Sequence, residues 1–168
     1  ISIFGPISGA HFNPIVSLVF WLKRMISSKD FIAYVVMQMC GAIFGCVVAN
    51  IIFKLPPVTI STLVRHDISQ FLSEILATFG LILVIFIGSE VSKQNIPVLV
   101  GSYIASAYWF TSSTSFANPA VTVARQFSDT FTGISPSGVP IFIIAQIFGA
   151  ILGFVVIQWL TNKVIKSD

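Results

Sequence analysis

The 168-residue sequence has few charged side chains: Asp, Glu, Lys and Arg make up 9% of it, whereas hydrophobic residues make up 55%. Soluble domains carry about 25% charged residues, so the composition excludes an ordinary soluble domain and indicates a protein of the lipid bilayer. The formal net charge is +3. Because the nine basic residues are scattered between apolar segments, we expect them to flank a membrane, with lipid and not nucleic acid as the partner.

Cysteine and catalytic side chains are equally scarce. The two cysteines, Cys40 and Cys46, lie within one apolar segment. Six residues apart on a helix, they point in different directions and are too far apart for a disulfide, so we interpret them as buried packing residues. The sequence contains no nucleophile–base pair, phosphate-binding loop or cluster of metal ligands. We therefore expect no enzymatic activity, no cofactor and no metal site.

Long apolar segments dominate what is present. Four are long enough to cross a bilayer, which needs roughly 17–25 apolar residues: they are residues 31–53, 71–88, 96–112 and 139–160. Two shorter segments, 13–22 and 118–127, reach only about half way through a hydrocarbon layer of about 30 Å. We predict an all-α membrane protein with four spanning helices and two re-entrant half-helices.

The basic residues predict an orientation. If successive spans alternate in direction, six of them fall on one side: Lys23, Arg24, Lys29, Lys93, Lys163 and Lys166. The opposite side holds only Lys54 and Arg65. Cytoplasmic loops are rich in Lys and Arg, so we predict a multi-pass protein of the cell membrane with a cytoplasmic C-terminus.

The chain contains an internal repeat. Residues 38–45 read QMCGAIFG and residues 146–153 read QIFGAILG, and each follows an Asn-Pro pair, at 13–14 and at 118–119. Within a single domain, 1–168, we place the two repeats at about 1–54 and 68–162. An odd number of spans between the units makes the second inverted relative to the first, an arrangement that places a pathway at the membrane midplane. By this symmetry the first repeat lacks two helices before its Asn-Pro pair.

The Asn-Pro pairs have a specific local chemistry. Asn is a preferred helix N-cap and Pro suits the first helical turn, so Asn13-Pro14 and Asn118-Pro119 each open a half-helix. Two opposed half-helices bring two positive dipole ends, each about +0.5 charge, to one point. Such a point repels cations and protons and offers amide donors to a passing oxygen atom. We therefore predict a pore for neutral small solutes.

The motifs resemble those of the aquaporin and glycerol-facilitator family, the major intrinsic proteins. SGAHFNPIV (8–16) is similar to the family's first Asn-Pro segment, SFANPAVTVA (115–124) to its second, and SEILATF (73–79) to its E-x-x-x-T-F signature. The resemblance implies a passive pore in each subunit, six spanning helices with two half-helices, and a homotetramer. It assigns Asn13, Pro14, Ile15, Asn118, Pro119 and Ala120 to the pore motifs.

Three departures from the family pattern matter. Ile15 stands where the family has Ala, the first helix and most of the second are absent, and Val121 stands where most members have a filter arginine. The resemblance also places Ser115 in the selectivity filter. For the filter position on the preceding helix, alignment through Gly101 gives Tyr108, the preferred choice, and counting back from Asn118 gives Ser106.

Three other residues receive roles. The family counterpart of Glu74 fixes the backbone of the second half-helix loop, and His11 is expected to hydrogen-bond backbone near the cytoplasmic vestibule, not to bind metal. Arg125 lies one helical turn beyond Val121. It either stands near the outer mouth and partly replaces the filter charge, or it snorkels or pairs near the helix end.

A filter without arginine is wider and excludes larger neutral molecules less strongly. Family members with a neutral filter are associated with glycerol-like polyols or metalloid acids such as arsenite. We therefore expect a passive channel for small uncharged solutes, including water. Two alternatives stay open: a water-selective pore, and a non-conducting truncated membrane protein.

Overall fold

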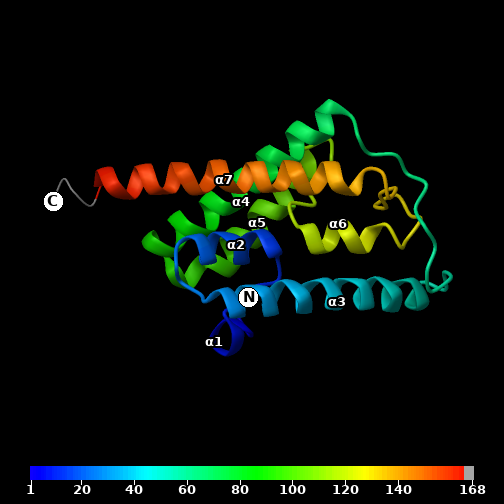
Figure 1. Ribbon diagram of the computed structural model, residues 1–168, viewed down its shortest axis with the longest axis horizontal. Coiled ribbons are helices and arrows are strands. Elements are labelled where there is room, and N and C mark those ends of the chain that lie inside the picture. Colours follow the sequence, from blue (N-terminus) through cyan, green and yellow to red (C-terminus); the bar gives the residue numbers. More distant parts are fainter. Residues whose placement is uncertain (165–168) are drawn as a thin grey trace.

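The computed structural model describes residues 1–164 and is helical, with no strand in that range. In chain order the elements are α1 (Gly5–Ser8), α2 (Pro14–Leu22), α3 (Ser28–Ile52), α4 (Ile68–Val91), the 3-10 helix η1 (Lys93–Asn95), α5 (Ile96–Phe110), α6 (Pro119–Arg125) and α7 (Val139–Val164) (Figure 1). The predicted all-α fold class is confirmed. Lys166, used above for the orientation, lies outside the described residues.

Three of the described helices are long and apolar enough to cross a membrane: α3, α4 and α7. The fourth predicted span, α5, has 15 residues, which is about 22 Å and short of a hydrocarbon layer of about 30 Å. The predicted end of this span, at residue 112, is two residues too late. Thr111 leaves the helix with extended backbone, and its hydroxyl donates to the carbonyl of Ala107 at 2.7 Å.

The two half-helices lie end to end beside α3 (Figure 1). Gln38, in the middle of α3, donates to the carbonyl of His11 just before α2, at 2.6 Å. Asn50, near the end of α3, donates to the carbonyl of Phe127 just after α6, at 3.1 Å. Two short helices therefore follow the length of one spanning helix, as the sequence predicts for a pair of half-helices.

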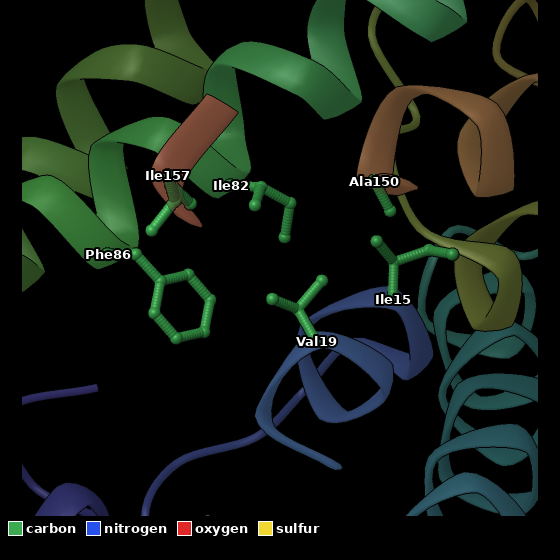
Figure 2. Close-up of a cluster of buried hydrophobic side chains, with 6 residues drawn as sticks. All are labelled: Ile15, Val19, Ile82, Phe86, Ala150 and Ile157. Carbon is green, nitrogen blue, oxygen red and sulfur yellow. The ribbon is translucent and has the colours of Figure 1, made fainter. Parts of the chain in front are cut away.

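A buried apolar cluster joins α2 to the long helices α4 and α7 (Figure 2). Its members are Ile15, Val19, Ile82, Phe86, Ala150 and Ile157. Ile15 is only 2% exposed, and Figure 2 shows it beside the small side chain of Ala150. The extra bulk that Ile15 brings to the first motif is thus taken up by packing against α7.

The glycines of the repeated QxxGAIxG pattern differ between the two halves. On α7, a Cβ at Gly149 would meet the carbonyl oxygen of Ile75, and one at Gly153 would lie 2.9 Å from Ile82, so α7 and α4 approach closely there. On α3, a Cβ at Gly41 or Gly45 would meet nothing within 4 Å. The small-residue face of α3 is therefore exposed in this chain, whereas its counterpart on α7 is covered. Cys40 on α3 is exposed as well and Cys46 is half-buried, so the prediction that both cysteines are buried is wrong.

This difference predicts unequal effects of the same substitution. Gly149→Val should destabilise the protein by about 1–3 kcal/mol or more, because the added side chain meets backbone of α4 that cannot rotate away. Gly41→Val makes the same change in helix propensity at the equivalent site of the first repeat, where space is open. Thermal unfolding in detergent measures both. Equal loss in the two variants would contradict the close approach of α4 and α7.

Candidate functional site

Each half-helix is opened by its asparagine. Asn13 has extended backbone, and its Oδ1 accepts from the backbone N–H of Ile15 at 3.0 Å. Asn118 has the same conformation, and its Oδ1 accepts from the N–H of Ala120 at 3.0 Å and from that of Val121 at 3.4 Å. Both side-chain oxygens are therefore used locally as N-caps, which leaves each NH2 group directed elsewhere.

The two NH2 groups cross over to the opposite half. Nδ2 of Asn13 donates to the carbonyl of Ala117 at 2.7 Å, and Nδ2 of Asn118 donates to the carbonyl of Phe12 at 3.0 Å. Each asparagine thus bonds to the residue that precedes its counterpart, so the N-termini of α2 and α6 meet. An amide NH2 carries two N–H donors, and one on each asparagine has no partner among these contacts.

Glu74 of α4 organises the loop before α6, as the resemblance implies. One carboxylate oxygen accepts from the hydroxyl of Ser113 at 2.6 Å and the N–H of Phe116 at 2.9 Å. The other accepts from the N–H of Ala117 at 2.9 Å and from Gln146 at 2.7 Å. Glu74 has no solvent exposure, so these four donors are what stabilises its buried carboxylate.

The backbone that Glu74 holds is strained. Thr114, Ser115 and Ala117 have positive φ angles of 63°, 50° and 45°, which non-glycine residues adopt at a cost of about 1–3 kcal/mol each. Ala10, in the loop before α2, has a φ of 52°. Strained residues of this kind persist where surrounding contacts determine the backbone, and here they turn the chain sharply into each half-helix.

The first half has an analogous but different set of contacts. Nε2 of Gln38 donates to the hydroxyl of Ser17 at 3.0 Å, just as Nε2 of Gln146 donates to that of Thr122 at 2.9 Å. The repeated glutamine therefore holds the same position of both half-helices, four residues after the asparagine. His11 is buried, and its Nδ1 lies 3.3 Å from Ser17 Oγ; its ring thus bonds a side chain and not the expected backbone.

A cavity of about 340 Å³ lies at the junction of the half-helices. Its lining includes both asparagines, Asn13 and Asn118, the three candidate filter residues, Ser115, Val121 and Tyr108, and also Arg125. Ser106 does not line it and donates its hydroxyl to the carbonyl of Ser102, so Tyr108 is the alternative that faces the cavity. The remaining motif residues support the half-helices from behind and are buried: Pro14, Ile15, Pro119 and Ala120.

Arg65 is an organising residue that the sequence does not reveal. It is 5% exposed, and its guanidinium donates to the carbonyls of Gly133, Ser113 and Phe131 at 2.8, 3.1 and 2.9 Å. Burial lowers the pKa of Arg65 from its ordinary value. These bonds tie the loop 53–67 to the loop 126–138 and to the loop before α6. The acceptors lie far away in sequence, so no local pattern marks this arginine.

Two capped half-helices that meet beside a cavity, within a bundle of apolar spanning helices, define a membrane channel. The profile of the family described as "Major intrinsic protein" matches residues 1–115, which is more than half of the chain. The chain belongs to the major intrinsic protein family.

Individual relatives agree with this assignment. Aquaglyceroporin AqpS of Rhizobium meliloti is 49% identical over 160 residues, which cover 95% of this chain and 69% of AqpS. Aquaporin AqpM of Methanothermobacter marburgensis is 27% identical over 173 residues, covering 95% of this chain and 70% of AqpM. The glycerol uptake facilitator protein of Bacillus subtilis is 28% identical over 150 residues, which cover 80% of this chain and 55% of the Bacillus protein.

Proposed function

We propose that the protein is a passive channel that moves small uncharged solutes down their gradient: glycerol-like polyols, metalloid acids such as arsenite, and water. It needs no cofactor and carries out no chemical step. The observation that supports this proposal most is the pair of asparagine amides, Asn13 and Asn118, in one cavity that also contains Val121. The amides offer hydrogen bonds to a hydroxyl oxygen, and the valine leaves room that an arginine would fill.

The names of the relatives support the same class of solute. AqpS is named an aquaglyceroporin and the Bacillus protein a glycerol uptake facilitator. The site assignments carry over as part of this proposal, with Asn13 and Asn118 as pore donors and Val121, Ser115 and Tyr108 as the filter. Glu74 acts through the loop before α6 that it contacts, and His11 acts through its contact with Ser17 of α2.

The repeats, orientation and assembly complete the proposal. We place the two repeats at about 1–54 and 68–162, with the loops 53–67 and 126–138 outside, the C-terminus in the cytoplasm, and the chain as one subunit of a homotetramer. Gly41 and Gly45 are exposed on α3, whereas their counterparts on α7 contact α4. We therefore expect a helix equivalent to α4 to cover α3 in the conducting channel.

Flux into proteoliposomes tests this function. In separate experiments, vesicles containing the protein are exposed to a gradient of glycerol, a gradient of arsenite or a purely osmotic gradient. The change in vesicle volume is followed by stopped-flow light scattering. Both solutes should enter faster than into empty vesicles of the same lipid. Because α3 is uncovered, a version extended by two preceding helices should conduct more than the 168-residue chain.

The alternatives make different predictions in the same assay. A water-selective pore accelerates osmotic shrinkage but leaves glycerol and arsenite entry at the level of empty vesicles. A non-conducting membrane protein accelerates neither, with or without the additional helices. Either result contradicts the proposed solute class.

A further inference from the structure

Building on the proposed channel function, we propose that Arg125 is the residue that excludes cations. It lies one helical turn beyond Val121 on α6 and supplies the positive charge that the uncharged valine does not. The family pattern places this charge at position 121. Here the charge is displaced to the C-terminal end of α6, so that one residue sets the width of the pore and another sets its charge.

Arg125 lies on the same face of α6 as Val121. Val121 and Arg125 are four residues apart, so they lie on one face of the helix and about 6 Å apart along its axis. Both line the cavity that contains Asn118. The side chain of Arg125 therefore faces the same space as the pore asparagine, and it does so from the end of α6 that leads into the loop 126–138.

Two contacts hold the guanidinium of Arg125 in place. Its Cζ lies 4.7 Å from the ring centroid of Phe116, and its Nη1 donates to the carbonyl of Thr132 at 3.1 Å. A guanidinium has five N–H donors, and within residues 1–164 this is the one hydrogen bond that the guanidinium of Arg125 makes. The group is fixed in place while most of its donors stay available to the cavity.

The positive charge of Arg125 has no carboxylate partner among the described residues. The buried carboxylate in this part of the protein, Glu74, is occupied by four donors from the loop and from α7. The positive charge of Arg125 is therefore not neutralised locally, and in a narrow low-dielectric passage an unpaired charge raises the barrier for cations steeply.

Comparison with Arg65 separates this role from a structural one. Cζ of Arg65 lies 5.4 Å from the centroid of the same Phe116 ring. However, three nitrogens of Arg65 donate to backbone carbonyls, and Arg65 does not line the cavity. Arg65 holds the loops together, whereas Arg125 faces the path of the solute. A cation at the C-terminal end of α6 also interacts favourably with the helix dipole. Any positively charged side chain at this position would make the same interaction.

The test compares sodium leak with glycerol flux in the same proteoliposomes. Arg125→Gln removes the charge at similar length and should raise sodium leak about tenfold, with glycerol entry retained. Arg125→Lys keeps the charge and should stay sodium-tight. Arg24→Gln, the same change in an exposed loop between α2 and α3, is the matched control and should leave both fluxes unchanged.

Salt dependence of the unmodified protein gives a second measurement that needs no variant. Raising ionic strength with choline chloride shortens the Debye length from about 30 Å at 0.01 M to about 3 Å at 1 M. If a fixed positive charge excludes cations, this screening weakens the exclusion, and the sodium leak at a constant sodium concentration should rise. A sieve based on size alone shows no such rise.

The outcomes distinguish the two proposals. If the unmodified protein passes no glycerol, the proposed channel function fails. If it passes glycerol and Arg125→Gln stays as sodium-tight as the parent, the role of Arg125 is wrong. Should Arg125→Gln fail to fold, a sodium leak that does not depend on ionic strength overturns the inference by itself.

Discussion

Glu74→Ala is expected to destabilise the protein by about 3–5 kcal/mol and to abolish solute flux. The substitution leaves four donors in a buried region without their acceptor: the Ser113 hydroxyl, the N–H groups of Phe116 and Ala117, and the Gln146 amide. Each unsatisfied buried donor costs about 1–3 kcal/mol, and some of that is recovered by relaxation. The strained turn into α6 then loses the contacts that fix it.

A conservative variant shows whether the acceptor count matters. Glu74→Gln keeps the shape but replaces one acceptor oxygen with an NH2 group, which would face two donors, so we expect an intermediate loss of stability. Glu90→Gln, the same change at an exposed position at the end of α4, should stay within about 0.5 kcal/mol of the parent. Denaturant titration in detergent compares the three. If Glu74→Gln behaves like Glu90→Gln, the carboxylate does not hold the loop.

Val121→Arg is expected to reduce glycerol and arsenite flux about tenfold, which corresponds to a barrier higher by about 1.4 kcal/mol, while water flux falls much less. The long side chain would extend into the cavity that Val121 now lines together with Asn118. Water needs less room than glycerol, and it can accept a hydrogen bond from the added guanidinium. Stopped-flow measurements of both fluxes in one vesicle preparation give the ratio.

Val121→Met is the matched control, because it adds length without charge or donors. If the width of the pore governs selectivity, the methionine variant should reduce glycerol flux nearly as much as the arginine variant. If it does not, the guanidinium itself excludes the larger solutes. An unchanged ratio of glycerol to water flux in Val121→Arg would remove Val121 from the filter.

The parts of the fold that depend on neighbouring residues could be predicted from the sequence. Asn13 and Asn118 mark the starts of α2 and α6 because an N-cap followed by proline is a local signal, and the structure has helices beginning at the next residue in both places. Long apolar segments predicted α3, α4 and α7, with ends wrong by a few residues. Ser27 caps α3 through the N–H of Asp30, so that helix starts three residues before the predicted 31.

The parts that depend on distant contacts could not be predicted. Arg65 looked like an ordinary loop cation, and its role follows from carbonyls that lie 48 to 68 residues further along the chain. The sequence favoured Tyr108 over Ser106 through the alignment at Gly101 but left both open, since the choice depends on how the loop after α5 turns. His11 bonds Ser17 because both rest against α3 through Gln38, which is a tertiary arrangement.

The crossed hydrogen bonds of Asn13 and Asn118 also have a consequence for biosynthesis. The amide of Asn13 and the carbonyl of Phe12 find their partners in residues 117 and 118, so the polar start of α2 stays unpaired until about a hundred more residues have been translated. At about 5–20 residues per second this takes roughly 5–20 s. The helix made directly after α2 is α3, whose Gln38 already bonds the His11 carbonyl. We therefore expect α3 to shelter the first half-helix from acyl chains until the second half-helix is made.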